Sequence, residues 1–170
     1  MTEFLVNTDF LFYIGGLVQW GFLMAFLYSL VYSINNPNKG NVWLSLIMSL
    51  SYSSSIFIDM GTITYFEFFL FDLLTFLSIV FSTFYIKKNI ISIYLIIGLS
   101  INMSLFFAMY IDYEVLYNYE FWWLWWVYIL GVNTVDFLMI AIFFINKDFL
   151  GLDMAKKWLI NSTVKDKVNG

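Results

Sequence analysis

Five long apolar runs constrain the fold of this chain more than any other feature. They cover residues 10–34, 42–60, 64–86, 90–111 and 121–145, with short polar segments between them. A bilayer core about 30 Å thick needs about 20 apolar residues per helix, and each run is close to that length. The runs are continuous rather than alternating, which excludes a membrane β-barrel. The sequence therefore predicts an all-α integral membrane protein, a five-helix transmembrane bundle.

The chain divides into a five-span transmembrane domain, residues 1–145, and a polar tail, residues 146–170. As a helix, the tail would carry an apolar face with two lysines beside it: Leu152, Ala155, Trp158, Leu159, Lys156 and Lys157. This pattern predicts a cytoplasmic amphipathic helix that lies on the headgroups of membrane lipids. A docking helix for a cytosolic protein partner is the alternative.

The basic residues predict the orientation of the bundle. They are Lys39, Lys87, Lys88, Lys147, Lys156, Lys157, Lys165 and Lys167. With five spans, all of them fall on the same side of the membrane, and the positive-inside rule makes that side cytoplasmic. We therefore expect the N-terminus outside and the C-terminus in the cytoplasm, with the protein in a plasma membrane or a bacterial inner membrane.

The residue types that the chain lacks exclude several classes of function. It has no Cys, no His and no Arg. Without Cys there is no thiol chemistry, and without His the commonest metal ligand and general base is missing. Without Arg, no side chain can bind a phosphate or carboxylate through two parallel hydrogen bonds. A net charge of -4 also argues against nucleic-acid binding. We therefore expect no enzymatic activity, no metal and no cofactor.

A stripe of small residues marks one face of the first run. Gly21, Ala25, Ser29 and Ser33 are each four residues apart, so they would share one side of a helix. Small side chains let helix backbones approach closely in lipid, where the hydrophobic effect does not drive helices together. The stripe predicts helix packing, either within the chain or between chains of a homo-oligomer.

Two acidic frames recur at the outer turns of the bundle. Ile-Asp, seven residues and Glu-Phe begin at residue 58 and again at residue 111, so Asp59 aligns with Asp112 and Glu67 with Glu120. One frame lies in residues 42–86 and the other in residues 90–145, and both run in the same direction along the chain. This suggests a parallel repeat of two helical hairpins.

Each of these four acids has a local interpretation. Thr64 and Glu67 have the spacing of a capping box, and Glu120 is expected in the first turn of the fifth helix. Asp59 and Asp112 each end an outward-running helix, where the helix dipole disfavours an anion, so they are either exposed to water or held to meet a cation. Together the four acids would form an outer mouth that concentrates cations.

Two further acids lie deep inside spans. Asp72 is 15 residues from Lys87 and Asp136 is 11 from Lys147, which places them roughly 22 and 16 Å from the inner boundary. A carboxylate at that depth costs at least about 2.5 kcal/mol and has no basic partner within the membrane. Asn102 and Asn133 are polar residues at similar depth. The two acids either are protonated and hydrogen-bonded between helices, or line water and bind a cation.

The sequence thus favours a small, oligomeric pathway for protons or small cations. Asp72, Asp136, Asn102 and Asn133 would be its midplane residues. The alternative is a membrane sensor or assembly subunit that couples the state of the bilayer, or of a partner, to a cytosolic effector protein through the basic tail.

The predicted topology can be tested by single-cysteine labelling, since the chain has no native cysteine. Cysteines at Glu3 and Leu116 should react with an impermeant reagent added outside intact cells. Cysteines at Lys39, Lys88 and Lys165 should stay protected until the membrane is opened. External labelling at Lys88 would contradict the five-span topology and the orientation drawn from the lysines.

Overall fold

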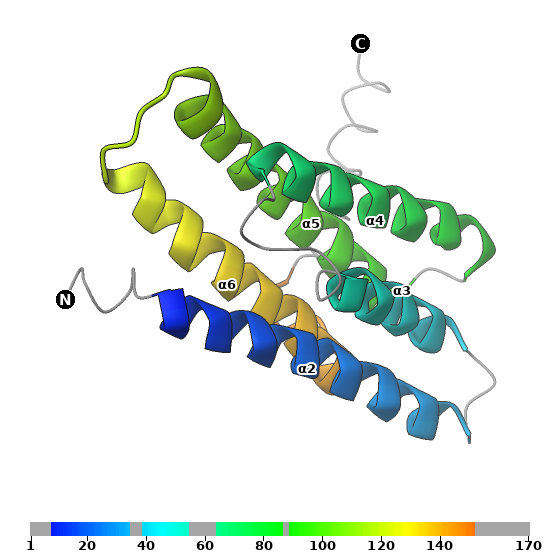
Figure 1. The fold of residues 1–170 in the computed structure, drawn as a ribbon. Coiled ribbons are helices and arrows are strands. Elements are labelled where there is room, and N and C mark those ends of the chain that lie inside the picture. Colours follow the sequence, from blue (N-terminus) through cyan, green and yellow to red (C-terminus); the bar gives the residue numbers. More distant parts are fainter. Residues whose placement is uncertain (1–7, 35–38, 55–63, 87–88, 152–170) are drawn as a thin grey trace, which may run out of the picture.

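The structure, a computed structural model, describes residues 8–34, 39–54, 64–86 and 89–151. Within these ranges the regular elements are all helical and no strand is present. They are α2 (Thr8–Ser33), α3 (Gly40–Ser54), α4 (Tyr65–Tyr85), α5 (Ile90–Met109), a short π-helix η2 (Tyr110–Val115) and α6 (Trp123–Ile145) (Figure 1).

The helices follow the apolar runs that the sequence predicts. Four stretches are long and apolar enough to cross a membrane: Tyr13–Ser33, Tyr65–Tyr85, Ile90–Val115 and Trp123–Ile145. The predicted run 42–60 is described only as far as Ser54, within α3. The chain is therefore a helical, multi-pass membrane protein. The orientation, the choice of membrane and the hairpin repeat stay predictions.

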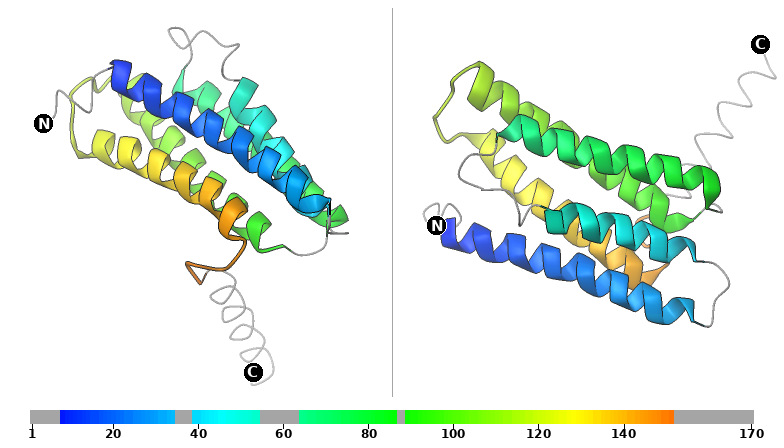
Figure 2. Two further views of the ribbon diagram at one scale, coloured as in Figure 1. Left: turned by 90° about the horizontal axis from the view of Figure 1, so that it is seen from below. Right: turned by 45° about the vertical axis from the view of Figure 1, so that its right-hand side comes forward.

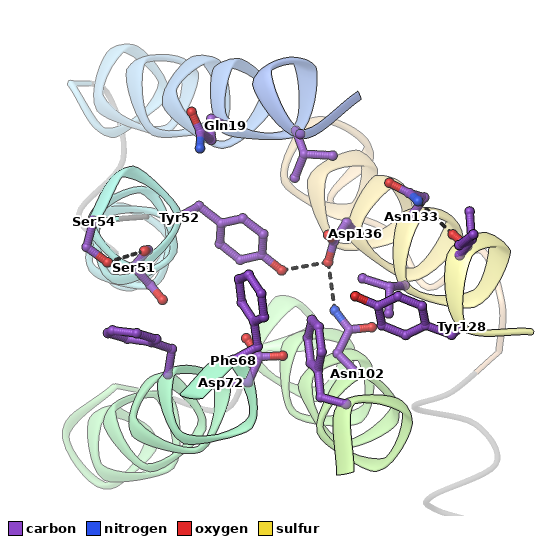
Figure 3. Close-up of a pocket in the computed structure, with 16 residues that line it drawn as sticks. Gln19, Ser51, Tyr52, Ser54, Phe68, Asp72, Asn102, Tyr128, Asn133 and Asp136 are labelled. Atoms are coloured by element: carbon purple, nitrogen blue, oxygen red, sulfur yellow. Dashed lines mark hydrogen bonds between the residues drawn. The ribbon is translucent and has the colours of Figure 1, made fainter. Parts of the chain in front are cut away.

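The five long helices form a closed ring. Each packs against its neighbour in the chain, and α6 returns to pack against α2 (Figures 1 and 2). Viewed along the bundle, the helices surround an interior to which all five contribute side chains (Figure 3). Successive helices run in opposite directions, so α2 and α6, the first and last of an odd number, run the same way.

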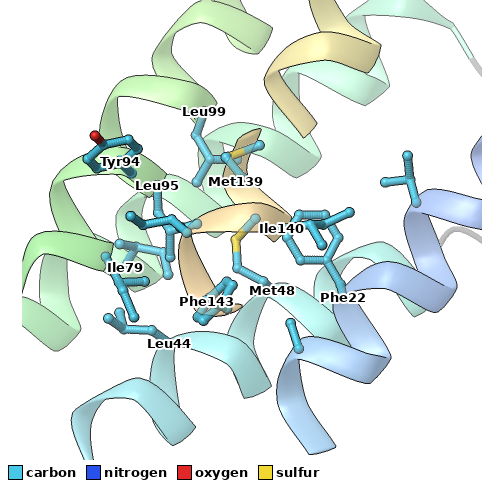
Figure 4. Packing of buried hydrophobic residues seen from close by; sticks show 14 residues of the cluster. Phe22, Leu44, Met48, Ile79, Tyr94, Leu95, Leu99, Met139, Ile140 and Phe143 are labelled. Atoms are coloured by element: carbon cyan, nitrogen blue, oxygen red, sulfur yellow. The ribbon is translucent and has the colours of Figure 1, made fainter. Parts of the chain in front are cut away.

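One half of this ring is filled by apolar side chains. The core lies towards the C-terminal ends of α2, α4 and α6 and the N-terminal ends of α3 and α5 (Figure 4). Its largest fully buried members include Phe22, Met48, Leu99 and Met139, which come from four different helices. The lysines predict that this half lies on the cytoplasmic side. Apolar side chains are closely packed between the helices here.

Two glycines bring helices close to α6 in this layer. A Cβ atom added at Gly98 would lie 2.6 Å from Sδ of Met139 and 3.2 Å from Cγ1 of Val135. One added at Gly21 would lie 2.6 Å from Cδ1 of Ile140. The missing side chains therefore let α5 and α2 approach α6 more closely than any larger residue would allow.

The predicted small-residue stripe packs within the chain. Ala25 has an exposed fraction of 0% and Ser29 of 3% in the isolated protomer. Gly21 faces α6, and both Gly21 and Ser33, at the two ends of the stripe, are partly exposed. The alternative that this stripe joins two chains has no support from Ala25 and Ser29, because their surface is already covered. The homo-oligomer stays a prediction without an assigned interface.

Local hydrogen bonds define several helix ends. The backbone N–H of Glu67 donates to Oγ1 of Thr64 at 3.3 Å, and the N–H of Thr64 donates to the Glu67 carboxylate at 2.8 Å. This reciprocal pair confirms the predicted capping box of α4. Asn89 caps α5 and also donates its side-chain amide to Asn41 at the start of α3, which ties these two helix ends together.

The close approach at Gly98 predicts the response to a larger residue. Gly98→Leu should push Met139 and Val135 aside and lower the free energy of unfolding by about 1–3 kcal/mol, the usual cost of overpacking. Gly16→Leu is the matched control, since nothing lies within 4 Å of a Cβ at Gly16. Thermal or denaturant unfolding in detergent measures both. Equal stability of the two variants would contradict the packing described here.

Candidate functional site

The other half of the ring encloses a partly open cavity of about 300 Å³. All five long helices contribute to its wall (Figure 3). Its polar lining comprises Gln19 from α2, Ser51, Tyr52 and Ser54 from α3, Asp72 from α4, Asn102 from α5, and Tyr128, Asn133 and Asp136 from α6. Two carboxylates face this space, and none of the residues that line it is basic.

Asp136 is held by two donors from other helices. The Tyr52 hydroxyl donates to Oδ1 of Asp136 at 2.6 Å, and the Asn102 side-chain amide donates to the same oxygen at 2.8 Å. Figure 3 shows both bonds converging on α6 from α3 and α5. Hydrogen bonds to an ionised group are shorter and stronger than neutral ones, so this cluster suits a carboxylate. It orients Asp136 firmly at the cavity wall.

Asp72 is placed differently. Its side chain is 9% exposed, and its buried Oδ2 atom has no hydrogen-bond partner among the described residues. Oδ1 of Asn102, a residue only 1% exposed, is unpartnered in the same way. Leaving a buried polar atom unsatisfied costs about 1–3 kcal/mol, and more for a charged group. Both atoms can act as hydrogen-bond acceptors. A proton, a water molecule or a cation bound to them would therefore remove this energetic cost.

A hydroxyl pair supports Asp72 one turn along α4. The hydroxyls of Thr75 and Ser51 lie 2.5 Å apart, and the Thr75 hydroxyl also reaches the Phe71 carbonyl at 2.8 Å. This pair joins α4 to α3 at the edge of the cavity. Asp72 therefore projects from a stretch of helix that is tied to its neighbour.

The structure brings the predicted midplane residues together. Asp72, Asp136, Asn102 and Asn133 all line the same cavity. Asn133 takes no part in the hydrogen bonds to Asp136, because its amide donates to the Ile129 carbonyl on its own helix at 2.6 Å. Their depth in the membrane and their role in a pathway stay predictions.

Tyr52 is a residue of the candidate site that the sequence analysis missed. Nothing marks it among 12 tyrosines. A usable signal lay in its spacing from Ser45 and Ser49, since positions three and seven residues apart share one helical face. Both serines are buried, so Tyr52 lies on the inward face of α3.

Asp112 is neither exposed to water nor left to meet a cation. Its side chain is buried, and its two carboxylate oxygens accept hydrogen bonds from the Asn118 amide at 3.0 Å and the Trp122 indole at 2.8 Å. The backbone N–H of Asn118 also donates to the Asp112 carbonyl at 3.0 Å. Asp112 therefore closes the turn between η2 and α6.

The remaining acids of the predicted mouth are Glu67, Asp59 and Glu120. Glu67 is exposed and engaged in the α4 cap, while Asp59 lies outside the described residues. Glu120 is exposed and precedes α6, so its predicted place in the first turn is wrong. The reason is that Trp122 is extended and bonded to Asp112, which delays the start of the helix. The acidic mouth stays a prediction.

The comparisons leave the site to be interpreted from its geometry. No protein-family model, curated protein or solved structure matches this chain. Among the described residues, no group of three or more acidic side chains is arranged to hold a metal ion. The features that remain informative are the two carboxylates, their different partners and the space between the helices.

The contrast between Asp112 and Glu120 yields a second test of the structure. Asp112→Ala should remove two side-chain hydrogen bonds at the turn between η2 and α6. It should lower the free energy of unfolding by about 1–3 kcal/mol, because each bond to the buried Asp112 side chain contributes about 0.5–1.5 kcal/mol. Glu120→Ala should change it by less than about 0.5 kcal/mol, as expected for an exposed side chain. Equal destabilisation of both variants would contradict the assigned turn.

Proposed function

We propose that this protein is a pathway for protons or small cations, and that the cavity is its binding site. The observation that carries the proposal is the buried Oδ2 atom of Asp72, which faces a cavity without any partner among the described residues. An ionisable residue inside a membrane span that lacks a partner is a functional site by default.

The two carboxylates have separate tasks in this proposal. Asp136 already has two donors, from Tyr52 and Asn102, so its charge is partly compensated and its position is set. Asp72 has no such donors, and it is the group that exchanges a proton or contacts a cation. A positive charge between the helices would offset both carboxylates in a medium where unpaired charges are costly.

The packed half of the ring favours a carrier over an open pore. The core that includes Phe22, Met48, Leu99 and Met139 is packed between the helices on one side of the cavity. In this proposal, an ion that enters the cavity leaves on that side only after these side chains rearrange. We therefore propose a second conformation of the bundle in which access changes sides, populated in equilibrium with this one.

Ion flux into liposomes tests the proposal. Asp72→Asn should abolish proton or sodium flux while leaving the bundle folded, because burying a neutral amide costs less than burying a charge. Asp136→Asn should abolish or strongly reduce it as well. Asp148→Asn is the matched control: Asp148 also accepts a tyrosine hydroxyl, from Tyr94 at 2.7 Å, but it does not line the cavity. Its flux should equal that of the wild type.

Two results would overturn the proposal in different ways. Flux that persists in both Asp72→Asn and Asp136→Asn would keep a pathway and remove these residues from it. Absence of wild-type flux across a range of pH and voltage would reject the pathway and favour the sensor or assembly alternative. The tail on which that alternative depends, residues 152–170, lies outside the described residues.

A further inference from the structure

The cavity is larger than a proton or an inorganic cation requires. Its volume of about 300 Å³ equals that of roughly ten water molecules at about 30 Å³ each. It also reaches the lower end of the range for small-molecule pockets, about 300–1,000 Å³. A site for a bare ion would be expected to close around it with several oxygen ligands, whereas this one leaves room for an organic molecule.

Aromatic rings form much of the wall. Tyr52 from α3, Phe68 and Phe71 from α4, Phe106 from α5 and Tyr128 from α6 all line the cavity. Phe68 stacks on Phe106 with ring centroids 5.3 Å apart, and Phe106 meets Tyr128 edge to face at 5.6 Å. These contacts join three helices into a continuous aromatic surface beside the carboxylates. Figure 3 shows the Tyr52, Phe68 and Tyr128 side chains extending into the space between the helices.

The polar atoms that lack partners define the charge of the ligand. Oδ2 of Asp72 and Oδ1 of Asn102 are buried acceptors, and the residues that contribute them are at least nine-tenths buried. Both residues line the cavity, and no basic side chain stands among the lining residues. The site therefore suits a ligand that is positively charged, and it would repel an anion.

We propose that the cavity binds a small organic ammonium ion, an amine or quaternary ammonium with apolar substituents. This inference rests on the proposed function, since it names the class of cation that the same site takes. The charged nitrogen would lie against Asp72 and Asn102, and the substituents would pack on the rings. Aromatic faces attract such cations, because the face of the ring carries the negative part of its quadrupole.

Titration of tetraethylammonium chloride into the full-length protein in detergent tests the inference, with sodium chloride as the blank. Wild type should bind it, and Asp72→Asn should weaken binding at least tenfold, because the unpaired charge is lost. Phe68→Leu should weaken binding about two- to tenfold by removing one ring. Phe69→Leu is the matched control and should bind like wild type, because Phe69 packs on Phe66 and Phe107 and does not line the cavity.

Phe71→Leu guards against a folding defect in Phe68→Leu. Phe71 lines the cavity and is 38% exposed, so its loss should weaken tetraethylammonium binding without disturbing the core. If both cavity variants bind like Phe69→Leu, the aromatic wall has no part in recognition and the inference is overturned.

The outcomes separate this inference from the proposed function. No binding of tetraethylammonium at millimolar concentration, together with proton or sodium flux that depends on Asp72, would overturn the inference and leave the pathway intact. Binding that depends on Asp72 and Phe68, with no flux of any cation, would support the inference and reject the pathway.

Discussion

The half of the ring that encloses the cavity depends on the hydrogen bonds that converge on Asp136. Tyr52 and Asn102 both donate to its Oδ1 atom, at 2.6 and 2.8 Å, and so connect α3 and α5 to α6. Tyr52 reaches α6 across the interior, although α3 and α6 are not neighbours in the ring. In lipid, where apolar contacts alone distinguish poorly between helix partners, such bonds also specify which helices meet. These bonds lie at the wall of the cavity and join three of the helices that surround it.

The two halves of the bundle differ because their interior residues differ. At one end, Gly21 and Gly98 allow helices to approach α6, and apolar side chains fill the remaining space between the helices. At the other end, rings and polar groups stand between the helices and leave space. The proposed carrier mechanism rests on this difference between a packed core and a partly open polar cavity.

The hydrogen-bond partners of the acidic side chains distinguish those with a structural role from the candidate binding group. Asp112 has donors on both carboxylate oxygens and closes a turn. Glu67 and Thr64 satisfy each other at a helix start. Asp136 has donors from two helices, and Asp72 retains a buried oxygen with none among the described residues. Acidic residues in this chain therefore range from a helix cap to a candidate binding group. Of these four acids, only Asp72 has a buried oxygen without a partner in the part of the chain that the structure describes, and a bound ligand would remove that energetic cost.

The sequence by itself determined the helices and the start of α4. These features depend on local physics: the length of an apolar run, and a capping box closed within four residues. It misplaced Glu120, because the start of α6 depends on a bond from Trp122 to Asp112, ten residues away.

Only the tertiary structure decided which side chains face one another. The spans are apolar on nearly every side, so their sequences do not specify how each helix is rotated. The inward face of Ala25 and Ser29, the closure of α6 on α2 and the cavity all follow from packing between helices. The decisive contact joins Tyr52 to Asp136, residues 84 positions apart. No local pattern can encode such a pair, because its distance is set by the whole ring.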